Sequence, residues 1–298
     1  MKPSIVQLSF RVFFLPLLLV FLTVNLVLLR DAKADTQPIK PAPIRFLLSF
    51  DDGPSAAIWQ NSTEHVLDAL AHNKIQPNIK AIFFAQTRAV NGGGTETGRA
   101  LLQREFADGH LLAFHSATPR HSNHRFLTPE ELELSLQRGV SDLTDITGTA
   151  PDLVRPPFWN YDARTMAAYE KHGMAMLLTD LSANDGKIWG VNFSMTKRRN
   201  MLKNLAIFKQ RWRQGLVPAV DGSTPVIVTF HDVNSYTASR MEVYLEILLE
   251  VAAELEMPVA SKPFYDDRDD LHRAAMERVT HVGDDKVRLP GLWNWLWQ

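Results

Sequence analysis

The stretch that decides the fold is Arg45-Phe46-Leu47-Leu48-Ser49-Phe50-Asp51-Asp52-Gly53-Pro54, an apolar run that ends in two adjacent carboxylates and a turn. Residues Arg45–Phe50 have the length and apolar content of a buried strand. Adjacent side chains leave a strand on opposite sides, so one carboxylate can bind a cation while the other handles a proton nearby. Gly53-Pro54 ends the strand and stiffens the turn. Ordinary turns carry the same residue types, so the interpretation depends on the rest of the chain.

Downstream of this stretch, strand-like and helix-like segments alternate. The predicted strands are Arg45–Phe50, Ile79–Ala85, Leu111–Phe114, Leu153–Val154, Met174–Thr179 and Pro225–Phe230. The predicted helices are Ser62–His72, Glu96–Asp108, Pro129–Ile146, Ala163–His172, Met195–Trp212 and Ser239–Glu254. Repeated units of strand, helix and strand indicate a parallel sheet that closes, or nearly closes, into a barrel. The expected fold class is α/β, a distorted (β/α) barrel of about seven parallel strands.

The N-terminal segment, residues 1–34, has the pattern of an export signal. Lys2 and Arg11 precede the uncharged run Val12–Leu29, and Ala32-Lys33-Ala34 offers a cleavage site between small residues. The run of 18 residues also reaches the lower end of a membrane span. The sequence therefore predicts a protein exported to the periplasm or cell envelope, with either a cleaved signal peptide or an N-terminal anchor that associates with the membrane.

The remaining segments are assigned by composition. Residues 35–43 are rich in proline and form a linker. Residues 44–265 form the barrel, and residues 266–298 form a C-terminal extension. The extension ends with tryptophan at positions 293, 295 and 297, a pattern that suits packing against the barrel, stacking on a sugar or contact with a membrane interface.

Composition excludes some partners and ligands. The 298 residues are 45% hydrophobic and carry a formal net charge of −1, which gives enough apolar content for one large domain, or at most two. There is no basic surplus to hold a phosphate backbone, so we expect no nucleic-acid partner. Because the chain has no cysteine, any metal must be held by histidine and carboxylate.

Polar side chains gather at the ends of the predicted strands. The residues at, or within two positions of, the carboxyl end of a predicted strand are Asp51, Asp52, His115, Arg155, Asp180 and His231. In a parallel barrel these ends converge on the catalytic face. We therefore expect these residues to share one site.

A metal site is expected where histidines join this group. His115 and His121 lie six residues apart on a segment that Pro119 excludes from a helix, and His124 is a third candidate. Two neutral imidazoles and the Asp52 carboxylate form a ligand set suited to zinc or another divalent ion, with a position left open for water. Such a metal activates water and polarises a carbonyl, as hydrolysis of an amide or ester requires.

These residues resemble the motifs of the polysaccharide deacetylase family, which has the NodB homology domain and comprises carbohydrate esterases of family 4. Phe50–Pro54 matches the first motif in full. Arg155–Phe158 matches the Arg-x-Pro-aromatic motif, Asp185 and Trp189 the fourth motif, and Thr229–Asp232 the last. The resemblance implies a NodB-type barrel, similar to a TIM barrel. It also implies a metal-dependent hydrolase that removes N-acetyl, or alternatively O-acetyl, groups from a glycan, and so acts on carbon–nitrogen bonds other than peptide bonds.

The resemblance implies a role for each matching residue. Asp51 is the general base that activates water, and Asp52, His115 and His121 are ligands of a divalent metal, with Zn²⁺ expected. Arg155 pairs with Asp51 and sets its charge.

The resemblance also implies roles for residues that face the substrate and the leaving group. The backbone N–H of Phe158 stabilises the oxyanion, and Trp189 contributes to the substrate groove. His231 is the general acid that protonates the leaving amine, and Asp185 orients it.

The chain departs from the family pattern in two motifs. Two additional residues precede His121, so His124 remains an alternative ligand. Three residues separate Asp185 from Trp189, and Asp180 remains an alternative partner for His231. These departures leave two other functions open, a non-catalytic glycan-binding or assembly protein and a hydrolase of a small amide.

Overall fold

A computed structural model of the protein describes residues 41–185 and 197–280. The predicted export segment, Trp189 and the tryptophan-rich tail lie outside the described residues. No helix in the two described ranges has the length and the apolar character needed to cross a membrane.

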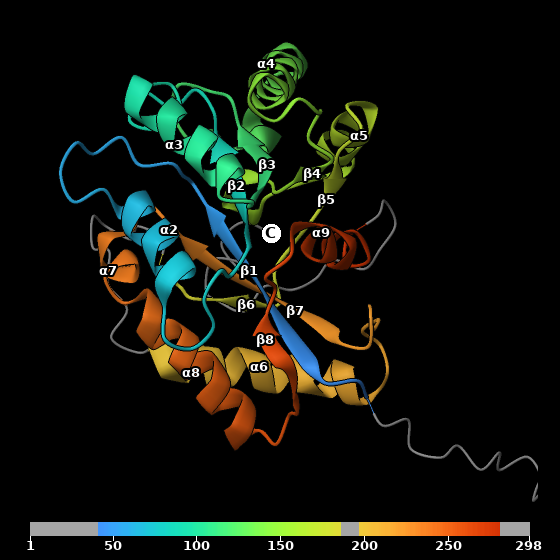
Figure 1. Ribbon diagram of the computed structural model, residues 1–298. Coiled ribbons are helices and arrows are strands. Elements are labelled where there is room, and N and C mark those ends of the chain that lie inside the picture. The colour runs from blue at the N-terminus through green and yellow to red at the C-terminus, as the bar shows by residue number, and fades with distance from the viewer. Residues whose placement is uncertain (1–40, 186–196, 281–298) are drawn as a thin grey trace, which may run out of the picture. The chain divides into compact units, whose positions relative to one another are not determined.

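Strands and helices alternate from the first described strand onward (Figure 1). The strands are β1 (Ile44–Asp51), β2 (Ala81–Gln86), β3 (Leu111–Ser116), β4 (Leu153–Val154), β5 (Ala175–Met176), β6 (Leu181–Ser182), β7 (Thr224–His231) and β8 (Val259–Phe264). The α-helices are α2 (Ser62–His72), α3 (Glu96–Ala107), α4 (Pro129–Thr147), α5 (Ala163–Lys171), α6 (Lys197–Arg213), α7 (Ser235–Ala238), α8 (Met241–Glu254) and α9 (Arg268–Met276). Short 3₁₀ helices span His124–Phe126 and Pro157–Trp159.

The strands form one curled parallel sheet. Its order is β5-β4-β3-β2-β1-β7-β6, and β8 pairs in parallel with the beginning of β1. The end strands β5 and β6 do not pair with each other in the described part of the chain, so the barrel is open there. This confirms the predicted distorted barrel of parallel strands. The register pairs Asp51 on β1 with His231 on β7, which places two of the predicted site residues side by side.

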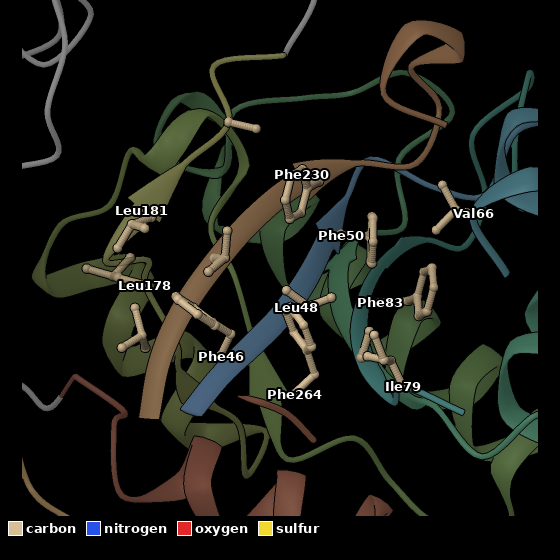
Figure 2. Packing of buried hydrophobic residues seen from close by; sticks show 14 of the residues in the cluster. Phe46, Leu48, Phe50, Val66, Ile79, Phe83, Leu178, Leu181, Phe230 and Phe264 are labelled. Atoms are coloured by element: carbon tan, nitrogen blue, oxygen red, sulfur yellow. The ribbon is translucent and has the colours of Figure 1, made fainter. Parts of the chain in front are cut away.

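Strand β1 is apolar throughout because both of its faces are buried. Figure 2 shows Phe46, Leu48 and Phe50 in the larger hydrophobic cluster, together with Val66 of α2. The same cluster includes residues of helices α4, α6 and α8. Leu47 belongs to a second cluster, together with inward residues of other strands and Leu271 of α9. Since alternate residues share a face, the Leu47 face also carries Ser49 and Asp51. The alternation of β1 thus directs Asp51 to the inner side of the sheet.

The predicted element boundaries differ from the structure mainly in the short strands. The predicted strand Met174–Thr179 is wrong in length, because β5 contains only Ala175–Met176 and the next residues lead into β6. The predicted strand Leu153–Val154 matches β4, whereas the two residues of β5 carry too little pattern to fix its length. The predicted helix Ser239–Glu254 corresponds to α8, which starts two residues later, at Met241. The short helix α7 before it was not predicted, and Asn234 caps it through its side chain.

The C-terminal part of the described chain contains two elements that the sequence did not predict, β8 and α9. The side chain of Asp267 accepts hydrogen bonds from the backbone of Asp269 and Asp270 and so starts α9. Leu271, Ala274 and Ala275 of α9 are buried in the second hydrophobic cluster. The boundary at residue 265 therefore stays a prediction, and α9 packs with the barrel although it lies beyond that boundary.

Candidate active site

Asp52 is the centre of the site. It follows β1 with a φ of 72°, in the left-handed region, so the chain turns sharply at the end of the strand. Its Oδ1 lies 3.1 Å from Nε2 of His115 and 3.4 Å from Nε2 of His121. Its Oδ2 lies 3.8 Å from Nε2 of His231. Three of the four predicted histidines thus meet at this one carboxylate.

The charge states of these groups suit metal binding. Burial raises the pKa of the Asp52 carboxyl, but the hydrogen bond from His115 and the charges of the three histidines outweigh burial and hold it well below its usual range. Burial lowers the pKa of His121 to about 4. Near neutral pH the site therefore offers an ionised carboxylate and a neutral imidazole at His121, as a divalent metal requires.

The geometry also fits a metal. One ligand atom from each of Asp52, His115 and His121 lies within 4.8 Å of the others. Nε2 of His121 is buried and makes no hydrogen bond within the described residues. Nδ1 of His115 lies 2.8 Å from the backbone carbonyl of Arg155, an outer contact that orients a ligating histidine.

The alternative ligand His124 lies elsewhere. It is fully buried, its Nδ1 is 2.9 Å from the hydroxyl of Tyr169, and its ring stacks on Phe114 at a centroid distance of 5.9 Å. Burial lowers its pKa to about 3. Its contacts are those of a histidine in the hydrophobic core.

Asp51 forms a buried ion pair. Nη1 of Arg155 lies 2.7 Å from Oδ1 of Asp51 and donates to Ser49 Oγ at 2.8 Å. Arg155 also donates from Nε to the backbone carbonyl of Leu177 at 3.0 Å, and its guanidinium lies 4.0 Å from the ring centroid of Phe84. These contacts fix the arginine, which in turn fixes the Asp51 carboxylate.

His231 is held by Asp185. Nδ1 of His231 lies 2.8 Å from Asp185 Oδ1, and the backbone N–H of His231 donates to Oδ2 at 3.0 Å. Thr237 donates its hydroxyl to the same Oδ2 at 2.6 Å. Burial lowers the pKa of His231, but the Asp185 charge and hydrogen bond, with the charges of Asp52 and Asp51, outweigh it and raise the pKa to about 10.

The alternative partner Asp180 does not contact His231. Its Oδ2 accepts the backbone N–H of Ile227 at 2.9 Å, and its Oδ1 lies 2.7 Å from Nη2 of Arg278. Asp180 thus ties β7 to the segment after α9.

Phe158 lies at the edge of the site. Its ring stacks on His121 with a centroid distance of 4.3 Å, and the residue is 49% exposed. Its φ of 60° places it in the left-handed region. Trp189, the other predicted substrate residue, lies outside the described residues.

Four further residues support the site and were not predicted. Nε2 of Gln86 donates to Asp52 Oδ1 at 3.2 Å, and Thr237 holds Asp185 as described above. Thr63 and Asp232 contact each other beneath the turn that carries Asp52. Gln86 and Asp232 have a signal in the sequence, because each is a polar residue at, or within two positions of, the end of an apolar strand.

The arrangement can carry out hydrolysis. It combines a candidate metal group, a carboxylate held by an arginine, and a histidine with a carboxylate partner, all around Asp52. A base, an acid and a Lewis acid at one site are the components that hydrolysis of an amide or ester needs.

Comparison with known proteins agrees with this chemistry. Residues 40–177 match the model of the family described as polysaccharide deacetylase. A peptidoglycan-N-acetylglucosamine deacetylase of Listeria monocytogenes is 28% identical over 207 residues, covering 67% of this chain and 35% of the relative. Chitin deacetylase 1 of Cryptococcus neoformans is 30% identical over 131 residues, covering 44% of this chain and 24% of that protein. The chain thus spans about a third or less of the length of either relative.

Solved structures share the fold. The chitin deacetylase of Colletotrichum lindemuthianum superposes with a TM-score of 0.54 and 21% identity, over 75% of this chain and 88% of that one. A family 4 carbohydrate esterase of Streptomyces lividans gives a TM-score of 0.51 and 20% identity, over 74% and 95% of the two chains. The NodB-type barrel expected from the motifs is thereby confirmed, and within it residues 40–177 are similar to the polysaccharide deacetylase family.

Proposed function

We propose that this protein is an exported, metal-dependent hydrolase that removes acetyl groups from a glycan. The observation that carries the proposal is the meeting of Asp52 with His115, His121 and His231 at one carboxylate. The proposal rests further on the names of the relatives, which are deacetylases of peptidoglycan and of chitin.

Asp52, His115 and His121 would hold the metal, and zinc suits one carboxylate with two imidazoles. When bound, the ion would supply Lewis-acid activation of water and of the acetyl carbonyl. Nε2 of His121 supports this assignment, because it is buried near Asp52 Oδ1 and makes no hydrogen bond within the described residues, and such a nitrogen is costly unless a ligand satisfies it.

Asp51 takes the proton from the attacking water in this proposal. Its ion pair with Arg155 holds one carboxylate oxygen and leaves the second oxygen available for the proton. Arg155 does not touch the substrate, and its task is to fix the direction of the Asp51 carboxylate.

His231 donates a proton to the leaving group. Its raised pKa means that it carries this proton at neutral pH, and Nδ1, which faces Asp185, leaves Nε2 directed to the site. An imidazolium held in one orientation by a carboxylate is suited to general acid catalysis. The acetyl oxygen would accept a hydrogen bond from the backbone N–H of Phe158, a contact of the type that typically contributes about 2.7–4 kcal/mol.

The rim of the site favours a glycan as the substrate. Exposed large hydrophobic side chains in the described ranges include Ile58, Trp59, Val90, Phe126 and Phe158, all on loops that follow β1 to β4. In a parallel barrel these loops lie on the same side as the site. Aromatic rings present an apolar face with little conformational entropy to lose, and the apolar face of a sugar ring matches them. We therefore propose that the substrate is a glycan polymer, several sugar units of which lie along this rim.

Export is proposed from the N-terminal pattern of charge and apolar residues. An exported chain would meet a glycan of the cell envelope outside the cytoplasm, and the name of the Listeria relative gives peptidoglycan, a glycan of this kind, as the substrate of that protein. A hydrolase of a small amide would have no need of an apolar rim.

The test is acetate release from a panel of N-acetylated and O-acetylated glycans, together with small cyclic and linear amides. The wild-type chain from Asp35 onward is compared with Asp51→Asn, which keeps the shape of the base but cannot take a proton. We expect release from one class of glycan, and a loss of at least 100-fold in Asp51→Asn. Equal glycan binding without release by either protein would favour a binding function, and release from the amides alone would favour the small-amide function.

A further inference from the structure

The backbone conformation of Gly53 does not explain why this position of the turn is a glycine. Its φ is not among the positive values found in the described chain, although those of Gly109, Gly148, Gly173, Gly215 and Gly222 are. A left-handed conformation therefore does not explain the need for glycine here. The explanation is steric, because a Cβ at Gly53 would lie 2.1 Å and 2.3 Å from the two carboxylate oxygens of Asp232.

Asp232 approaches the turn from the end of β7. The residue is 0% exposed. Its Oδ2 accepts the hydroxyl hydrogen of Thr63 at 2.6 Å, and the same hydroxyl oxygen accepts the backbone N–H of Ser55 at 2.9 Å. One carboxylate is thus linked to the first turn of α2 and, through Thr63, to the residue that follows Gly53-Pro54.

The second oxygen of Asp232 has no hydrogen-bond partner within the described residues. A buried carboxylate that is only partly satisfied lowers stability. An apolar residue of similar size at this position would avoid that cost, so the carboxylate must serve some other requirement of the fold or the site.

The turn itself needs support from its surroundings. Asp52 has a φ of 72°, which is unfavourable for a residue with a side chain. From the other side the backbone N–H of Gln86 donates to the carbonyl of Gly53 at 2.8 Å. Gln86, at the end of β2, and Asp232, directly after β7, therefore support the turn from the two strands that flank β1.

We propose that Asp232 is a positioning residue of the metal site. It fits into the space left by the missing side chain of Gly53 and, with Thr63, holds the turn in the conformation that directs the Asp52 carboxylate to His115 and His121. The inference rests on the proposed metal site, and it explains why the turn requires glycine at position 53.

A double-mutant cycle on zinc affinity tests this directly. Zinc dissociation constants are measured by competition with a chelator for wild type, Gly53→Ala, Asp232→Ala and the double variant, all prepared without metal. We expect Gly53→Ala to weaken binding at least tenfold, because its methyl group displaces the turn. In the Asp232→Ala background the same change should cost less than threefold, since the opposing carboxylate is gone. An equal loss in both backgrounds would overturn the proposal.

Thr63 provides the conservative control. Thr63→Ser keeps the hydroxyl that donates a hydrogen bond to Asp232 and should retain zinc affinity within about threefold. Thr63→Val removes this hydroxyl and should weaken zinc binding as Asp232→Ala does. The thermal unfolding of the metal-free proteins is recorded alongside, and a loss of stability with unchanged zinc affinity in Thr63→Val and Asp232→Ala would make both residues merely structural. If Asp232→Ala lowers kcat while zinc affinity is unchanged, Asp232 acts through His231 and the proposal fails.

Failure of the proposed function is distinguishable from failure of this inference. The cycle needs no glycan, so coupling between positions 53 and 232 can be observed even if wild type releases no acetate. That result would overturn the proposed activity and leave the role of Asp232 in place. Acetate release by wild type without coupling between positions 53 and 232 would support the proposed activity and overturn the role of Asp232.

Discussion

Asp52 and Asp51 are adjacent, yet their surroundings give them different capacities. Asp51 lies on the inner face of β1, where Arg155 holds it. Asp52 has left the strand with a positive φ and faces three imidazoles. The different surroundings of the two carboxylates thus follow from one residue of strand geometry and one turn, and they suit the two roles proposed above.

The pair of His231 and Asp185 gives a prediction about pH. Replacement of Asp185 by Asn removes the charge that raises the pKa of His231. Because His231 acts in its protonated form, activity falls as pH rises through that pKa, and a lower pKa moves this fall to lower pH. We expect the alkaline limb of the kcat/KM profile to shift downward, with a loss of kcat of about 10²–10⁴-fold.

Asp180→Asn is the matched control, because Asp180 contacts Ile227 and Arg278 and not His231. Its alkaline limb should stay where wild type has it. A shift in Asp180→Asn of the same size, or no shift in Asp185→Asn, would contradict the assignment of Asp185 as the partner of His231.

At the scale of elements, the loop between β1 and α2 presents apolar side chains at the rim. Nδ2 of Asn61 donates to the carbonyls of Ser55 and Ala57 at 3.0 Å and 2.9 Å, which closes the base of the loop. Trp59 lies on this loop and is 86% exposed. Because the loop is already ordered by these hydrogen bonds, binding at Trp59 costs less conformational entropy than it would on a flexible loop.

This arrangement predicts dependence on substrate length. Trp59→Ala should raise KM for long acetylated oligomers by about three- to tenfold, equivalent to about 0.7–1.4 kcal/mol of stacking, and leave kcat unchanged. Steady-state kinetics on oligomers of increasing length provide the measurement. Ile207→Ala, at an exposed position on α6, is the control and should change neither constant. An equal rise in KM for the shortest and the longest substrates would exclude a distant sugar contact at Trp59.

Elements with strong local signals could be predicted from the sequence. Helix α2 spans Ser62–His72 as predicted, with Asn61 as its side-chain cap, and α4 starts at Pro129 with a capping box. Strands β5 and β6 have only two residues each, and their pairing is set by neighbours far along the chain. Such elements depend on tertiary contacts and have no pattern of their own.

The site divides in the same way. His115, Arg155 and His231 could be predicted because each lies at a strand end, where the chain order alone brings them together. The contact of Thr63 with Asp232 joins residues 169 positions apart. Nothing in the local sequence of either residue marks that contact, since it depends on how α2 sits against the end of β7.

At the scale of the whole molecule, one buried group opposes folding. Glu105 on α3 is 1% exposed, and neither of its carboxylate oxygens has a partner within the described residues. Burial, and to a smaller extent the charge of Asp232, raises the pKa of Glu105 well above its ordinary value of 4.5. The folded protein therefore keeps this proton at a pH where the unfolded chain releases it.

The consequence is a pH-dependent loss of stability. Below the ordinary pKa, Glu105 is protonated in the folded and the unfolded protein, so its titration does not change stability. Above that pKa the free energy of unfolding falls by at most about 1.4 kcal/mol per pH unit. Glu105→Gln removes this titration, so its stability relative to wild type should rise from pH 4.5 to pH 8. Denaturant unfolding of the metal-free proteins measures the difference. Glu246→Gln, at an exposed position on α8, should show no such trend, and a constant difference for Glu105→Gln would refute the account.

We propose above that a metal held by Asp52, His115 and His121 supports removal of acetyl groups from a glycan. The most direct measurement follows zinc content and acetate release in the same samples of wild type and Asp52→Ala, before chelation, after chelation and after zinc is restored. We predict one zinc per wild-type chain, release that disappears with the metal and returns with it, and neither zinc nor release in Asp52→Ala. Undiminished acetate release by metal-free wild type, or by Asp52→Ala, would contradict the claim.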